Sequence, residues 1–185
     1  MTNLTSAFIF LLFEFNIKFS TVNSTTVHSV YLIPRFVGYL CLLLVWRAPA
    51  LSEDFSRKRV FFFLMFFFEL FRWIGALFFY NPTSSQVATT FSVIATLYTV
   101  HIITNVIDDI QHKNAIDLYS QALKTIWYWM TAIDGILLLL TLFQKEFMIL
   151  WLIAVIIRIR YCVQLYRSKK LLFESIPHNL IEHYK

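Results

Sequence analysis

Long apolar runs separated by short polar stretches dominate the pattern of the chain. Apolar runs of about 20 residues are long enough to cross the hydrocarbon core of a bilayer as helices. The four strongest runs predict helices over residues 58–80, 87–107, 126–143 and 147–166. The pattern therefore favours a helical membrane protein.

A fifth, weaker run extends over residues 27–46 and is interrupted by Pro34 and Arg35. Proline kinks or breaks a helix, so we expect a short outer stub followed by a helix from Arg35 to Trp46. Residues 1–26 contain an apolar stretch that is too brief to span a bilayer. This N-terminal segment is typical of an interfacial helix or of a lead-in to the bundle.

Composition agrees with a membrane environment. Of the 185 residues, 58% are hydrophobic, against about 45–50% apolar residues in a typical soluble domain. We predict an all-α, polytopic bundle of four or five transmembrane helices with short loops, formed by residues 27–166. Because only 3 glycines occur, close crossings of the GxxxG kind are not expected to organise it.

The net charge of +5 is unevenly placed. Basic residues gather before the first strong run, between the second and third, and after the last, whereas the loops at residues 81–86 and 144–146 hold a single lysine. Positive residues favour the cytoplasmic or matrix side, so the C-terminus is predicted to lie inside. The polar stretch 108–124 is expected to form a short surface helix there. A plasma membrane, an endomembrane and the mitochondrial inner membrane all fit this asymmetry.

Charged residues inside the apolar runs are the strongest functional signal. Counted inward from the outer helix ends, Glu69, Asp134 and Arg158 lie about 14–17 Å deep, near the bilayer midplane. A carboxylate at that depth needs a partner. Arg72 follows Glu69 at i+3 spacing, and Asp134 and Arg158 stand at similar depths on the two arms of a hairpin. We predict an intramembrane charge cluster made of these two pairs.

The run at residues 87–107 also carries polar residues at helical spacing. One face contains Tyr98, His101, Asn105 and Asp108, and a neighbouring stripe contains Ser92, Thr96 and Thr99. A histidine titrates near neutral pH, so a route from Glu69 along the first face could carry protons. Purely structural pairing is the favoured interpretation, ahead of a proton path and of a ligand or lipid pocket.

Catalytic and metal-binding motifs are absent from the sequence. It has no GxSxG, HExxH, CxxC or glycine-rich phosphate loop, so no catalytic residue, cofactor or metal site is predicted. Cys41 and Cys162 lie within apolar runs and are interpreted as packing residues.

The C-terminal tail, residues 167–185, is first basic and then amphipathic. Arg167, Lys169 and Lys170 are predicted to contact lipid headgroups, where each basic residue adds about 1 kcal/mol of attraction to an anionic surface. Nucleic acid is not an expected partner, because the basic residues are not interleaved with aromatic ones on a common surface.

Three hypotheses for function remain open. The first is a non-enzymatic membrane subunit or adaptor that docks through Phe-rich helices onto a larger membrane protein. The second is a small oligomeric transporter or channel that handles protons or cations through Glu69, His101 and Asp134. The third, weakest, is an integral-membrane lipid enzyme using Asp108, Asp109 and the basic tail. The lipid bilayer and either another membrane protein or a second copy of the chain are the expected partners.

Overall fold

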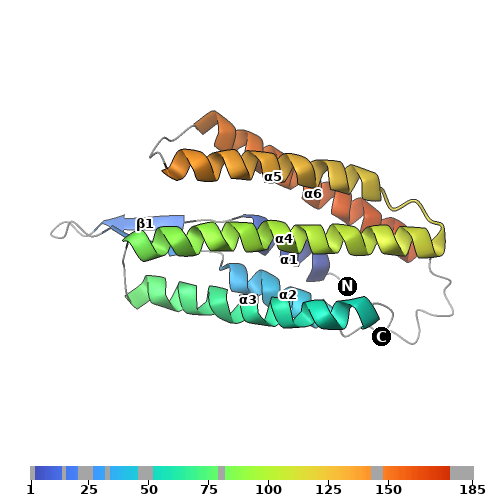
Figure 1. Ribbon diagram of the computed structural model, residues 1–185, viewed down its shortest axis with the longest axis horizontal. Helices are drawn as coiled ribbons and strands as arrows, with labels where there is room; N and C mark the ends of the chain where they lie inside the picture. Colours follow the sequence, from blue (N-terminus) through green and yellow to red (C-terminus); the bar gives the residue numbers. More distant parts are fainter. Residues whose placement is uncertain are drawn as a thin grey trace. The chain divides into compact units, whose positions relative to one another are not determined.

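The computed structural model describes residues 3–13, 16–20, 27–31, 34–45, 52–78, 82–142 and 148–175, which are mainly helical (Figure 1). In chain order the elements are α1 (Asn3–Leu12), β1 (Asn16–Ser20), β2 (Val27–Tyr31), α2 (Arg35–Val45), α3 (Ser52–Phe78), α4 (Pro82–Asn114), α5 (Ser120–Leu142) and α6 (Met148–Ser175). The chain divides into two compact units, residues 1–92 and 93–185, and α4 contributes to both.

Helices form at each of the four strongest apolar runs, as predicted, but their ends differ. The surface helix expected over residues 108–124 is wrong, because α4 continues to Asn114 and α5 already begins at Ser120. Residues of helical propensity prolong both helices beyond their apolar portions. The two helices are therefore joined by a tight connection.

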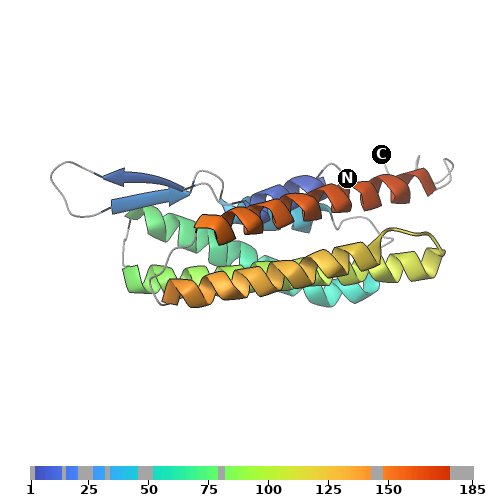
Figure 2. The same cartoon turned by 90° about the horizontal axis from the view of Figure 1, so that it is seen from above.

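The expectation of a purely α-helical chain is corrected by a β-hairpin. β1 and β2 pair antiparallel, with Asn16 opposite Tyr31 and Ser20 opposite Val27 (Figure 2). Val and Tyr in β2 are good strand formers, so residues 27–31 are a strand instead of an outer helical stub. The N-terminal segment, expected to be interfacial, supplies α1 and β1.

α2 begins at Arg35, as the position of Pro34 predicted. The carbonyl of Pro34 accepts a hydrogen bond from the Val37 amide at 3.1 Å, which closes the first turn. With 11 residues, α2 is roughly 16 Å long. It is too short to cross a bilayer by itself.

In the first unit, α1 packs closely on α2, and α2 packs on α3. Gly38 permits the first contact, because a Cβ atom there would lie 2.6 Å from Leu11 Cγ and 2.8 Å from the Ala7 carbonyl oxygen. One close crossing therefore depends on glycine, although few crossings of this kind were expected. Between α2 and α3, the Phe36 ring meets Phe66 and Trp73 edge-on, at centroid distances of 6.0 and 5.7 Å.

In the second unit, α5 and α6 lie side by side (Figure 1). Tyr161 of α6 is fully buried, and its hydroxyl lies 2.9 Å from Thr104 Oγ1 of α4. Closer to the C-terminal end of α6, Ser168 donates a hydrogen bond to the Leu118 carbonyl at 2.6 Å. Hydroxyl contacts thus join α6 both to α4 and to the connection that precedes α5.

Three helical segments are long and apolar enough to cross a membrane, judged by length and composition over the described residues. They are Gln86–Lys113, Ser120–Thr141 and Met148–Leu171. These segments support membrane association of the chain. The full count of four or five spans stays a prediction.

Candidate functional site

Glu69 lies at the centre of a buried polar network in the first unit. The side chain of Glu69 is 2% exposed, and its Oε2 accepts a hydrogen bond from Arg72 Nε at 2.9 Å. The two residues are three positions apart in α3, so the helix itself brings them together. The pairing expected from the spacing is present.

The second oxygen of Glu69 connects α3 to the beginning of α4. Ser92 donates a short hydrogen bond to Glu69 Oε1 and accepts one from Arg35 Nη1 at 2.5 Å. Thr89, one turn before Ser92, accepts a hydrogen bond from Arg72 Nη1 at 3.4 Å. Side chains from α2, α3 and α4 therefore form one hydrogen-bonded network, in which Ser92 connects Arg35 of α2 to the Glu69 carboxylate.

Sequence reasoning placed Ser92 in a polar stripe but did not connect it with Glu69, and it treated Arg35 only as a helix interruption. Arg35 is buried although it carries a full charge. A charged residue at the start of an apolar helix was the signal available in the sequence. Charge-assisted hydrogen bonds of this kind are stronger than neutral ones, so the network stabilises the packing of these three helices.

The second unit contains a simpler ion pair between neighbouring helices. Asp134 of α5 is 5% exposed, and its Oδ1 accepts a hydrogen bond from Arg158 Nη2 of α6 at 2.7 Å. The similar depths counted along the sequence placed these residues opposite each other, and the structure brings them together. The predicted four-residue charge cluster is thus observed as one pair in each unit.

The polar face predicted on α4 separates into distinct contacts. Tyr98 is 52% exposed. Asn105 Nδ2 lies 3.0 Å from His101 Nε2, and the His101 ring lies against Trp127 at a centroid distance of 4.5 Å, with the two rings tilted by 34°. Asp108 instead contacts Lys124.

The neighbouring hydroxyl stripe is the more deeply buried of the two. Ser92, Thr96 and Thr99 are all buried, and Thr99 donates to the Ala95 carbonyl of its own helix at 2.8 Å. A threonine in a helix commonly bonds in this way. This contact gives Thr99 a structural role.

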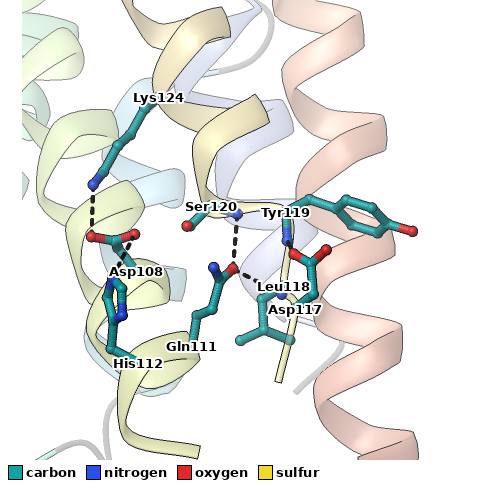
Figure 3. Close-up of polar contacts among 8 residues, drawn as sticks. All are labelled: Asp108, Gln111, His112, Asp117, Leu118, Tyr119, Ser120 and Lys124. Atoms are coloured by element: carbon teal, nitrogen blue, oxygen red, sulfur yellow. Dashed lines mark hydrogen bonds and ion pairs between the residues drawn. The ribbon is translucent and has the colours of Figure 1, made fainter. Parts of the chain in front are cut away.

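Asp108 belongs to a polar cluster around the connection between α4 and α5 (Figure 3). Its Oδ2 accepts a hydrogen bond from Lys124 Nζ at 2.6 Å, and His112 Nε2 lies 3.8 Å from Oδ1. Gln111 Oε1 accepts hydrogen bonds from the amides of Leu118 and Ser120, at 2.9 and 3.2 Å.

The backbone of this connection has an unusual conformation, and nearby side chains accept hydrogen bonds from its amides. Ala115 and Tyr119 have φ angles of 51° and 57°, which non-glycine residues rarely adopt. Asp117 Oδ1 accepts a hydrogen bond from the Tyr119 amide at 2.9 Å. Together with Gln111, it satisfies amides at the start of α5 that have no partner within the helix.

The remaining predicted contacts lie near the end of α6. Arg167 and Lys170 are exposed and Lys169 is half-buried, an arrangement that suits contact with a charged surface. Residues 176–185 of the predicted tail lie outside the described residues. Among the residues that are described, no group of three or more His, Cys, Asp or Glu side chains is arranged to hold a metal ion.

Within each unit, these contacts connect neighbouring helices through pairs and short networks of charged and polar groups. Comparisons with models of protein families, with curated proteins and with solved structures give no match to this chain.

Proposed function

We propose that this chain is a non-enzymatic, multi-pass integral membrane subunit or adaptor, which docks through the Phe-rich outer face of α3 onto a larger membrane protein. The observation that carries the proposal is the contrast between the two faces of α3. One face buries Phe62, Met65 and Glu69 within the first unit. The other is apolar and exposed.

The exposed face forms a regular stripe, which we call the α3 stripe. Its residues recur at alternating spacings of four and three: Val60, Leu64, Phe67, Phe71 and Ile74. This is the repeat with which one helix packs along another.

Aromatic rings give the α3 stripe a defined shape. Phe63 lies beside Phe67 with ring centroids 4.8 Å apart, and Phe67 lies 6.3 Å from Phe71, which is 66% exposed. Large aromatic side chains are enriched in protein interfaces, where they carry much of the binding energy. A row of rings that already contact one another loses little entropy on binding a partner.

The inward ion pair supports the same conclusion. Glu69 and Arg72 neutralise each other beside α4, so the α3 stripe presents no charge of its own. In a bilayer such a stripe contacts either lipid or another helix. Its aromatic content and repeat favour a helix of a larger protein, with the C-terminus of the chain on the cytoplasmic or matrix side.

The decisive experiment is gentle detergent extraction of the tagged chain from its native membrane, followed by mass-resolved size exclusion and identification of co-eluting proteins. We expect a stoichiometric membrane partner. In the double variant Phe67→Ala/Phe71→Ala we expect the affinity for this partner to fall roughly tenfold or more, because truncating an interface residue that carries binding energy costs more than about 1 kcal/mol, and about 1.4 kcal/mol in total is already tenfold.

The matched control is Ile136→Ala/Leu139→Ala, which truncates two exposed apolar residues of α5. This control should retain the partner. A homo-oligomer without other proteins, or equal partner loss in both variants, would contradict the proposal.

A second candidate is a small oligomeric transporter or channel for protons or cations. The hydrogen bond between His101 and Asn105 supports it, since an imidazole ring is held there by a polar neighbour on a helix long enough to span a membrane. In proteoliposomes, this candidate requires Glu69→Gln to abolish flux whether or not Arg72 is also changed. A folded Glu69→Gln/Arg72→Gln variant without flux would favour transport over docking.

A further inference from the structure

Two arginines of α6 lie two residues apart and have opposite surroundings. Arg158 is hydrogen-bonded to Asp134 of α5. Arg160 is exposed, and no hydrogen bond or ion pair joins it to another residue in the part of the chain that the structure describes. Two positions in a helix differ by roughly 200° in direction, so Arg160 faces away from the helix that Arg158 contacts.

Arg160 interrupts an apolar stripe on this outer face, which we call the α6 stripe. With Arg160 as its fourth member, the stripe has spacings of four, three, four and three, and its apolar members are Ile149, Ile153, Ile156 and Val163, all exposed. Ile156 is 63% exposed and lies one turn before the arginine. The spacing again matches the seam of two packed helices.

The position of Arg160 along α6 makes a lipid headgroup a poor partner. In the orientation proposed above, exposed Tyr166 and Arg167 mark the inner interface. Arg160 lies six residues (166 − 160) before Tyr166, which is about 9 Å along the helix. Helical side chains lean toward the N-terminus of their helix, and the N-terminus of α6 is its outer end. The Cα–Cβ bond of Arg160 therefore points toward the bilayer centre, so the side chain would have to bend back along the helix to reach the nearer headgroups.

We propose that the α6 stripe binds a transmembrane helix of a partner protein, and that a Glu or Asp in the inner half of this helix pairs with Arg160. A guanidinium that faces hydrocarbon requires a carboxylate or equivalent acceptor, and the flanking isoleucines and valine supply the apolar surface for the rest of the contact. The inference rests on the membrane placement in the proposed function but concerns a different helix from the α3 stripe.

The test uses synthetic transmembrane peptides and the full chain reconstituted in phosphatidylcholine vesicles. Leu-rich peptides carry one Glu, Gln or Leu at the depth of Arg160, and a second set displaces this residue toward the other end to cover both insertion directions. Association is measured by fluorescence energy transfer between the labelled chain and the labelled peptide. We expect the Glu peptide to bind roughly tenfold more tightly than the Leu peptide, the size of polar contacts between membrane helices.

Variants of the chain assign this preference to one residue. Arg160→Leu and Arg160→Gln are both expected to remove it, and the Gln variant preserves much of the side-chain length in case Leu alters folding. Arg167→Leu, which changes an exposed arginine of the same helix near the interface, should keep it. Circular dichroism and thermal unfolding check that each variant is folded.

Two results would overturn the inference. One is equal binding of the Glu, Gln and Leu peptides by the unchanged chain. The other is a response of the unchanged chain to added phosphatidylglycerol, without any peptide preference, that both Arg160 variants lose; this would assign Arg160 to a lipid phosphate. Because no native partner is used, failure here is distinguishable from failure of docking through α3.

Discussion

Glu69 and Asp134 are both buried acids on apolar helices, but their charges are balanced in different ways. Glu69 receives one hydrogen bond from an arginine of its own helix and one from Ser92 of α4. Asp134 receives its hydrogen bond directly from Arg158 of a neighbouring helix. At Glu69 the neighbouring helix thus contributes a hydroxyl, whereas at Asp134 the neighbouring helix contributes the counter-charge itself.

The two arginines therefore contribute differently to the packing of the helices. A pair at i,i+3 forms in any helix with that sequence, so the neutralisation of Glu69 does not by itself select a neighbouring helix, although Arg72 also donates a hydrogen bond to Thr89 of α4. Arg158 can neutralise Asp134 only when α5 and α6 have the correct register and rotation. The interhelical pair is therefore the one that specifies packing, a role well attested for buried polar groups in other helical assemblies.

The largest effect is expected from Glu69→Gln, which leaves the mostly buried Arg72 without its counter-charge and disturbs the contact to Ser92. Breaking a buried ion pair from one side costs about 3–5 kcal/mol of unfolding free energy. The double variant Glu69→Gln/Arg72→Gln should recover part of the loss, because it removes both charges. Denaturant unfolding in detergent micelles measures both, and equal losses in the single and double variants would refute the argument.

Asp134→Asn should cost less, about 2–3 kcal/mol, since a single charge-assisted hydrogen bond is lost and Arg158 is partly exposed. Asp109→Asn is the matched control, because Asp109 is exposed on α4, and its stability should not change. If the pair sets the register of α5 and α6, disulfide cross-linking of cysteines placed on the two helices should also become less selective in Asp134→Asn. Unchanged selectivity would argue against that role.

Gly38→Ala and Gly135→Ala together compare how tightly the helices are packed around a glycine in each unit. The added methyl would overlap Leu11 and the Ala7 carbonyl, so we expect a loss of about 1–2 kcal/mol from overpacking. Gly135→Ala is the control in the second unit, where nothing lies within 4 Å of the added Cβ atom. That change should be neutral or stabilising by up to about 1 kcal/mol, because alanine favours a helix. Similar thermal shifts for both variants would contradict this difference.

The smallest effect is expected from Ser168→Ala, which removes the hydrogen bond to the Leu118 carbonyl. The expected loss is about 1 kcal/mol, with faster hydrogen exchange in the connection between α4 and α5. Thr141→Ala removes a hydroxyl that bonds within its own helix on an exposed face and serves as the control. Unaltered exchange in Ser168→Ala would mean that Gln111 and Asp117 alone hold the connection.

Much of this architecture follows from the sequence alone. Apolar runs determined the four long helices, since a helix satisfies its own backbone hydrogen bonds wherever the run is long, and three of these helices contain segments long and apolar enough to cross a membrane. The i,i+3 spacing determined the pairing of Glu69 with Arg72, and Pro34 determined where α2 begins. The pairing of Asp134 with Arg158 was predicted because a short loop places similar depths opposite each other.

The remaining features depend on contacts between elements, which spacing along the chain does not predict. The β-hairpin depends on strand pairing, the meeting of Arg35, Ser92 and Glu69 depends on the rotation of three helices, and the close approach at Gly38 depends on how α1 crosses α2. Spacing along one helix gives the direction of a side chain but not the element that it meets. The sequence thus determined which groups need partners, and the packing of the helices determined which partners they have.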